Sequence, residues 1–340
     1  MEKSLEKKAE QKKSQIQKII DVSTPSQMLC LALTLILFSK IPACISSANT
    51  YSRFRKLENP SYDRESLEDF WIVIPCSLVI RLIKVAVNKS SHSYFKGKLQ
   101  HKYSGETLEN KIVKCSRGIF KVLYFTFTFC FGLFAVLRQT PFASPTMFGD
   151  GEMMYTFGSW PYTVMPYGLK FYYLLSFSYY VEDGIMHLFM PPNYDYWEMI
   201  LHHTLTAMLI FASYMNGFWN IGIFVLIQMD MEDIWIGMIR VVMDYSSTAV
   251  VAILYSCIMI SWAYFRFYAY VKTVLLGFSM VGRLATDNNT DVQPVINLLL
   301  ITLLGLNIYW FILLLKMGIC ILKGKPKDLQ NVVTKKDLQD

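Results

Sequence analysis

Residues 197–238 read WEMILHHTLTAMLIFASYMNGFWNIGIFVLIQMDMEDIWIGM, which is two apolar segments joined by Asn216-Gly217. Each segment approaches the roughly 20 residues that an α-helix needs to cross a bilayer. An Asn-Gly pair is a turn signal, and so short a link makes the two flanking helices antiparallel neighbours. The stretch therefore predicts a helical hairpin inside a membrane.

The ionisable residues of this hairpin include a His202-His203 pair in the first segment and Asp230 and Asp233 in the second. Such a side chain costs on the order of a few kcal/mol inside a bilayer, so it needs a partner or a wet cavity. His202 lies about four residues from the start of its segment and Asp233 about six from the end of the next, which gives depths of roughly 6 and 9 Å. The histidines and aspartates are therefore expected to face each other at nearly the same depth.

This arrangement favours acyl transfer. A carboxylate that accepts the ring N–H of a histidine fixes its tautomer and makes it a stronger base or nucleophile. We expect His202 to be the nucleophile or base, and His203 to support it or exchange roles with it. Asp230 and Asp233 would orient the histidines and stabilise developing positive charge.

Other roles for the same four residues stay open. They can form a structural hydrogen-bonded cluster, a path for protons or a metal site, since two histidines and two aspartates suit zinc or iron. Adjacent histidines point about 100° apart on a helix, which makes chelation by both awkward. We therefore expect no metal and no redox cofactor.

The composition excludes a soluble enzyme, because 53% of the 340 residues are hydrophobic and only 17% are charged, against roughly 25% charged in soluble domains. We expect an all-α integral membrane protein with about eight transmembrane helices, at 25–46, 69–88, 118–138, 168–189, 198–215, 218–239, 249–277 and 295–322. The net charge of +7 comes from Lys and Arg beside the spans, which indicates a bilayer and not nucleic acid as the partner. These residues concentrate on the side of the N-terminus, which predicts that both termini are cytosolic.

The chain divides into four parts. They are a basic cytosolic tail (1–24), two spans with a basic cytosolic loop (25–109), a catalytic membrane domain (110–322) and a cytosolic C-terminal tail (323–340). The basic loop is expected over 89–117, and Arg81 and Lys84 interrupt the second span. The sequence leaves open the roles of three more polar residues in the fourth span, Glu182, Asp183 and His187.

The spacing of the polar residues resembles a known motif, and the matching positions are His202, His203, Thr206, Ser213, Tyr214, Asn216, Gly222, Asp230 and Asp233. This is the Lag1 motif of the ceramide synthase family, which carries the TLC domain. The lead-in at 195–199 and Tyr180 also fit, and the resemblance covers about residues 110–322. Three positions depart from it: Met229 stands where the family has His, Gly237 where Glu is common, and Arg240 where it has Lys. The family's Lys-x-x-Glu-x-x-Trp entry is not recognisable in 111–117.

The resemblance implies N-acylation of a sphingoid long-chain base by a fatty acyl-CoA in the endoplasmic reticulum membrane, within a TLC-type helical core that encloses a lipid cavity. Acyl-CoA is then a co-substrate, and a homo- or hetero-dimer is left open. The expected substrate contacts are Tyr180, Thr206, Tyr214, Arg266, Lys111 and Lys114, the two lysines attracting the CoA phosphates. The alternatives are a non-enzymatic TLC-domain protein that binds or senses lipid, and a metal-dependent membrane hydrolase or hydroxylase.

Overall fold

The computed structural model describes residues 25–58, 65–140, 143, 145–147, 151–152, 160, 165–190, 195–281 and 292–322. Within these ranges every regular element is a helix. The main helices are α2 (Pro25–Ser39), α3 (Ile41–Glu58), α4 (Val73–Leu99), α5 (Gly105–Cys130), α6 (Tyr167–Leu188), α7 (Tyr196–Met215), α8 (Trp219–Val242), α9 (Thr248–Ser261) and α11 (Val292–Leu322). The short or distorted helices are η1 (Leu67–Ile72), η2 (Phe131–Val136), η3 (Leu137–Gln139), η4 (Pro145–Met147) and η6 (Trp262–Val281). The expected tails lie outside the described residues.

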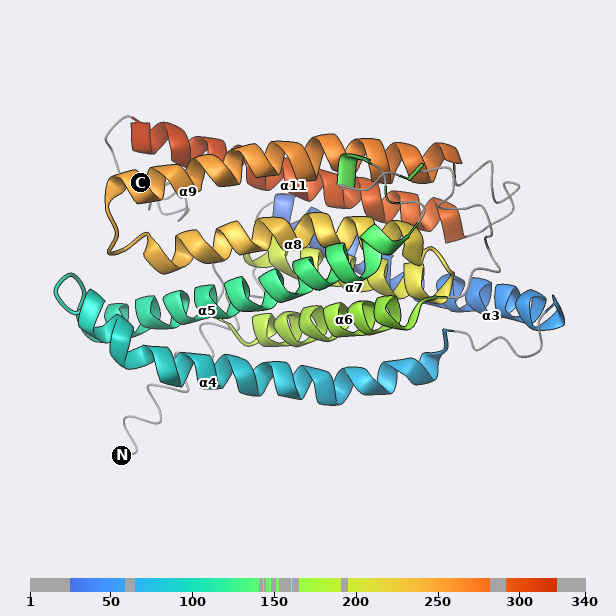
Figure 1. Ribbon diagram of the computed structural model, residues 1–340, viewed down its shortest axis with the longest axis horizontal. Helices are drawn as coiled ribbons and strands as arrows, with labels where there is room; N and C mark the ends of the chain where they lie inside the picture. Colours follow the sequence, from blue (N-terminus) through green and yellow to red (C-terminus); the bar gives the residue numbers. More distant parts are fainter. Residues whose placement is uncertain are drawn as a thin grey trace.

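The helices run roughly side by side along the long axis of the molecule, with α4 at one edge and α9 and α11 at the other (Figure 1). Among the described residues, five helical stretches are long and apolar enough to cross a membrane: Gln27–Thr50, Leu67–Leu99, Gly105–Val136, Thr248–Phe278 and Val292–Ile319. The all-helical membrane architecture is therefore confirmed. Helices α6, α7 and α8 are not among the five, so the count of eight spans stays a prediction.

The difference between the two sets of helices follows from their positions. The outer helix α4 exposes large apolar side chains such as Leu78 and Leu82, the latter 67% exposed, as a lipid-facing helix must. Helix α8 is buried along most of its length. A helix enclosed by others can carry polar groups, because its neighbours and not lipid satisfy them.

The hairpin expected at the centre of the chain is confirmed. Helix α7 ends at Met215 and α8 begins at Trp219, and Gly217 adopts a left-handed φ of 74° that suits glycine. The side-chain amide of Asn216 donates to the carbonyl of Ala212 at 2.9 Å. These contacts close the turn and fix α7 and α8 as antiparallel neighbours.

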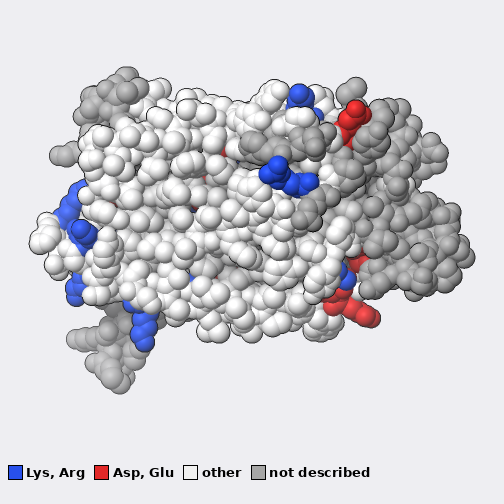
Figure 2. All heavy atoms as spheres, viewed as in Figure 1, with Lys and Arg blue, Asp and Glu red and all other residues white. Residues whose placement is uncertain are grey.

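The expected basic loop at 89–117 is wrong. Helix α4 continues to Leu99 and α5 begins at Gly105, so only a short turn separates them. Phe95 and Leu99 pack with Leu108 and Ile112 in a small apolar core of their own, which explains why the charged segment is helical. Lys and Arg still gather at this end of the molecule, beside a broad surface with few charges (Figure 2).

Helices α5 and α8 cross at very short range. A Cβ added to Gly237 would lie 2.9 Å from Val122 Cγ2 and 3.0 Å from the carbonyl oxygen of Gly118. A Cβ on Gly118 would lie 2.9 Å from the carbonyl oxygen of Gly237. Small residues let membrane helices approach this closely, and the contacts leave no room for a Glu side chain at 237.

Replacing Gly237 with alanine is therefore expected to destabilise the protein by roughly 1–3 kcal/mol, the usual cost of overpacking. Gly97→Ala is the matched control, because a Cβ there meets nothing within 4 Å. It is expected to be neutral or to stabilise by about 0.5–1 kcal/mol, since alanine favours a helix over glycine. Thermal unfolding in detergent measures both, and equal melting temperatures for the two variants would contradict the close crossing.

Candidate functional site

The two histidines of α7 face different neighbours. The ring of His202 lies 6.2 Å from that of Tyr180 on α6 and 5.2 Å from that of Trp310 on α11. Thr206 is one turn along the same face of α7. His202 therefore sits between three helices, on the helical face that continues through Thr206.

His203 faces the polar end of α6 instead. Its Nε2 lies 3.7 Å from Oδ2 of Asp183, and its ring is 5.7 Å from that of His187. A Cβ on Gly184 would lie 3.2 Å from Cβ of His203, so the glycine lets α6 and α7 come together here. Asp183 and His187, whose roles the sequence left open, thus lie beside the histidine pair.

The aspartates of α8 bond to other partners than the histidines. Tyr172 donates its hydroxyl proton to Oδ2 of Asp230 at 2.8 Å, and Lys121 pairs with Oδ1 of Asp233 at 2.9 Å. The Nδ1 atoms of both His202 and His203 are buried and have no hydrogen-bond partner among the residues that the structure describes. The structure does not show the expected direct contact between the histidines of α7 and the aspartates of α8. Asp233 nevertheless lies within electrostatic range of His202.

Lys121 is a site residue that the sequence analysis missed. It lies on α5 one turn after Gly118, so the close crossing with α8 brings its ammonium to Asp233. A lysine inside the apolar run GIFKVLYF was the available signal, since a buried charge needs a partner.

Lys84 is the second missed residue. It pairs with Oδ1 of Asp183 at 2.8 Å and also contacts Glu182. Glu182 is buried and lies 3.8 Å from the guanidinium of Arg81 as well. The two basic residues that seemed to weaken the second span therefore face the acidic residues of α6.

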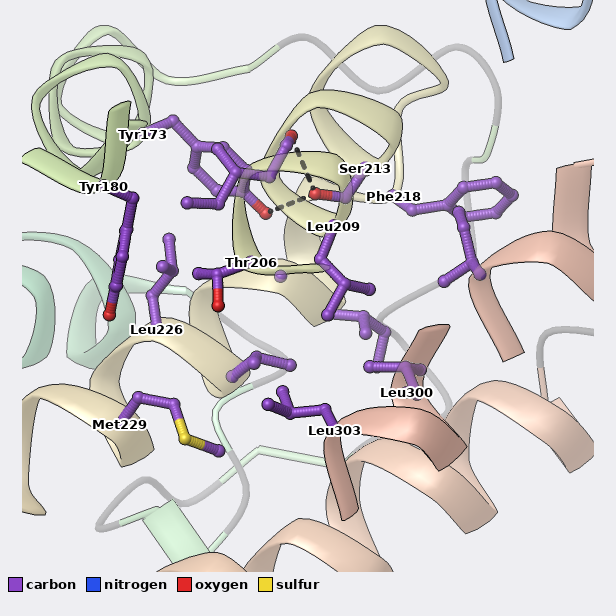
Figure 3. Close-up of a pocket in the computed structure, with 15 residues that line it drawn as sticks. Tyr173, Tyr180, Thr206, Leu209, Ser213, Phe218, Leu226, Met229, Leu300 and Leu303 are labelled. Carbon is purple, nitrogen blue, oxygen red and sulfur yellow. Dashed lines mark hydrogen bonds between the residues drawn. The ribbon is translucent and has the colours of Figure 1, made fainter. Parts of the chain in front are cut away.

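An apolar pocket lies between residues of α6, α7, α8 and α11 (Figure 3). Tyr180, Thr206 and Met229 line one end, and Phe218 and Leu300 line the other. The other lining residues are Tyr173, Leu209, Ile210, Ser213, Ile221, Gly222, Val225, Leu226, Ile296 and Leu303. The position where the Lag1 motif has its third histidine is thus an apolar part of the pocket wall.

Arg266 is buried close to the histidines. One of its terminal nitrogens donates to Oδ1 of Asn307 at 2.8 Å, and the guanidinium lies over the ring of Trp262 at 4.4 Å. It is within electrostatic range of His202. Arg266 therefore belongs to the same buried region and does not extend to the membrane surface.

Tyr214 lies apart from the histidines. Its hydroxyl donates to Oδ2 of Asp69 at 2.7 Å, and it is about three helical turns from His202 along α7. The structure therefore places it near the far end of the pocket helix and next to η1.

The two lysines expected to attract CoA differ in environment. Lys111 pairs with Asp244 at 2.8 Å, whereas Lys114 is exposed. Burial raises the pKa of Asp244, but hydrogen bonds from Lys111 and Tyr103 outweigh burial and hold that pKa below its ordinary value. The charge of Lys111 is thus partly neutralised at neutral pH, which leaves Lys114 as the freer of the two.

No metal site of three or more His, Cys, Asp or Glu residues occurs in the described parts of the chain. The two histidine side chains point in different directions, as expected for adjacent residues on a helix: His202 faces Tyr180 and Trp310, and His203 faces Asp183.

Comparison with known proteins identifies the shared region. Residues 114–316 match the TLC domain (TRAM_LAG1_CLN8). The chain is 28% identical over 225 residues to sphingosine N-acyltransferase lac1 of Schizosaccharomyces pombe, covering 61% of this chain and 55% of that protein. It is 25% identical over 224 residues to ceramide synthase LOH2 of Arabidopsis thaliana, covering 64% and 72% respectively. It is 28% identical over 186 residues to human ceramide synthase 1, covering 51% and 52%. The chain thus spans about half the length of the fission-yeast and human relatives.

Proposed function

Because the chain belongs to the TLC-domain family and resembles its ceramide synthases, we propose that it transfers a fatty acyl group from acyl-CoA to the amine of a sphingoid long-chain base. The observation that carries the proposal is that the ring of His202 lies 6.2 Å from that of Tyr180, one of the residues that line an apolar pocket. A nucleophile or base at the end of an apolar channel is what transfer of a lipid acyl group requires.

The acyl chain lies in the pocket between α7, α8 and α11. His202 precedes the lining residue Thr206 by one turn, and Ser213 lies about two turns further along α7. The distance from His202 to Ser213 is roughly 16 Å at 1.5 Å per residue, close to half of the roughly 30 Å hydrocarbon core. We propose that the acyl chain follows this face of α7 over a length close to the depth of one bilayer leaflet.

Two routes to the amide use the same groups. In the first, an imidazole nitrogen of His202 attacks the thioester carbonyl, the C–S bond breaks, and the CoA thiolate leaves and takes up a proton. The amine of the base then attacks the acyl carbon, a C–N bond forms as the bond to His202 breaks, and the ammonium proton passes to a histidine. In the second route His202 accepts the amine proton while the amine attacks the thioester carbonyl directly. The C–S bond then breaks, and the CoA thiolate leaves with the proton that His202 returns.

Buried charges near His202 stabilise the positive charge that either route creates. Asp233 is within electrostatic range of His202 and is held by Lys121. Asp230 is fixed by Tyr172. We assign both aspartates an electrostatic role that requires no direct bond to an imidazole.

The CoA group must stay in water, so the polar end of the site faces the cytosol. Lys114 is exposed and Arg117 lies at the same end of α5, where they attract the CoA phosphates. The proposal places the protein in the endoplasmic reticulum membrane with both termini cytosolic.

Filling the pocket tests where the acyl chain binds. Leu303→Trp on α11 adds bulk to the pocket wall, and it is expected to lower kcat/KM by tenfold or more for long-chain acyl-CoA and much less for short-chain acyl-CoA, because only a long chain reaches the added ring. Ile301→Trp is the matched control, since Ile301 is 58% exposed on the same helix. A loss that is the same for all chain lengths, or one shared by the control, would show that the chain binds elsewhere.

The activity itself is tested on membranes that contain the chain, with sphinganine and acyl-CoA of several chain lengths. An N-acylated base that appears only when the chain is expressed supports the proposal. Absence of product at every chain length, with folded protein present, would contradict the proposed activity.

A lipid-binding protein without turnover is the second candidate, and the apolar Met229 in place of the motif's histidine is the observation that favours it. In that case the purified protein binds a fluorescent fatty acid or acyl-CoA, Leu303→Trp weakens binding, and His202→Ala leaves binding intact while no amide forms in either protein.

A further inference from the structure

We propose that Asp183, held by Lys84 of α4, is a positioning residue for His203, so that the acyl-transfer site extends into a helix that precedes the TLC domain. This inference rests on the proposed acyltransferase function. The match to the TLC domain begins at residue 114, whereas α4 spans Val73–Leu99. The site is therefore incomplete without a segment outside the region that defines the family.

The contacts form a chain of three groups on three helices. Nζ of Lys84 lies 2.8 Å from Oδ1 of Asp183, and Oδ2 of the same carboxylate lies 3.7 Å from Nε2 of His203. A carboxylate that faces an imidazole favours one tautomer and one ring orientation. Nδ1 of His203 is buried and has no hydrogen-bond partner within the described part of the chain, so no described side chain fixes this ring through that nitrogen.

Lys84 is not a solvent-exposed surface residue. Its helix neighbours Leu82 and Ile83 are exposed on the apolar outer face, whereas the Lys84 side chain is only 14% exposed and points toward α6. Its ammonium also lies 4.7 Å from the ring centroid of Tyr179. A lysine turned inward from a lipid-facing helix has to be compensated by carboxylates, and both of its carboxylate partners lie on α6.

Only one of those two carboxylates contacts a histidine. Asp183 faces His203, while Glu182 contacts Lys84 and Arg81. Glu182 therefore acts as a structural partner of Lys84. Of the two carboxylates, Asp183 is the one through which the ion pair orients the ring of His203.

The charges around His203 predict opposite effects on its protonation. His187 and Asp183 face it from α6, Lys121 from α5 and Lys84 from α4, and His202 is its neighbour on α7. Loss of the Asp183 carboxylate disfavours an imidazolium, so the acid limb of the rate–pH profile moves to lower pH. Loss of the Lys84 ammonium favours an imidazolium, so that limb moves to higher pH.

The experiment compares Asp183→Asn, Lys84→Met and the double variant in purified full-length protein with sphinganine and acyl-CoA. We expect each single variant to lower kcat by tenfold or more while KM for acyl-CoA changes less than threefold. The acid limbs of the two single variants shift in opposite directions. The double variant is expected to lose no more than the worse single variant, because both changes act through the same contact.

Two further variants separate positioning from folding. Lys89→Met, an exposed lysine on α4, is expected to match wild type in rate and melting temperature, and Asp183→Glu is expected to restore part of the rate. Additive losses, unshifted pH profiles, or an equal loss in Glu182→Gln would overturn the inference while leaving the acyltransferase function standing. A wild-type protein that makes no amide would instead remove the proposed function itself.

Discussion

Alanine at His202 is expected to lower amide formation by at least about a hundredfold, the lower range for removal of a catalytic acid, base or nucleophile. The ring of His202 lies next to Tyr180, a residue of the pocket wall, whereas the neighbouring His203 faces Asp183. Release of CoA and formation of the amide are measured together in detergent-purified protein.

The control for this variant is His92→Ala, because His92 is an exposed histidine on α4 that pairs with Glu109 at 2.9 Å. It is expected to keep the full rate. A His202→Ala protein that is folded and retains more than a tenth of wild-type activity would show that the chemistry takes place elsewhere.

Replacing Asp233 with asparagine is expected to give the second largest effect, a loss of turnover of tenfold or more. The change removes a charge near His202 and leaves the partly buried Lys121 without its carboxylate. Breaking a buried pair from one side costs roughly 3–5 kcal/mol of stability. Melting temperature and kcat are therefore both expected to fall.

A double variant separates the two effects. Asp233→Asn with Lys121→Met removes the stranded charge, so the melting temperature is expected to recover toward wild type while kcat stays low. If kcat recovers together with stability, the Lys121–Asp233 pair is structural and Asp233 has no electrostatic role. Asp230→Asn is also expected to lose at least tenfold, and Tyr172→Phe less, because the carboxylate is retained.

The hairpin was predictable because its signals are local. The Asn216-Gly217 pair lies between two apolar segments, and Gly217 indeed takes the left-handed conformation. The charged segment 89–117 was predicted wrongly because its apolar residues are few. Phe95, Leu99, Leu108 and Ile112 recur at helical spacing and pack in a small cluster apart from the main core. Whether α6, α7 and α8 cross the bilayer cannot be read from their hydropathy, since enclosed helices need no apolar surface.

The sequence suggests residues for the candidate site, but it does not predict which of them contact each other. The cost of a charge in a membrane singles out His202, His203, Asp230 and Asp233 from the sequence alone. Partner choice depends on how closely helices far apart in the chain approach each other. The glycine contact between α5 and α8 accompanies the pairing of Lys121 with Asp233, and no local pattern predicts that distance.

The approach of α4 to α6 was hidden for the same reason. Lys84 reads as a defect in a weak span when the span is taken alone. The structure explains its presence in the span, because Lys84 forms ion pairs with Glu182 and Asp183 of α6. A lysine and a carboxylate pair in separate apolar segments are a signal for contact, but the sequence does not say which segments meet.

The most direct test of the account uses purified wild-type protein in lipid nanodiscs, acyl-CoA labelled with ¹³C in the acyl chain, and sphinganine labelled with ¹⁵N. The account predicts one product that carries both labels, formed in equal amount to the CoA released. Labelled free fatty acid in place of that product would indicate a hydrolase, and no turnover with any chain length would indicate a lipid-binding protein; either result would contradict acyl transfer at His202.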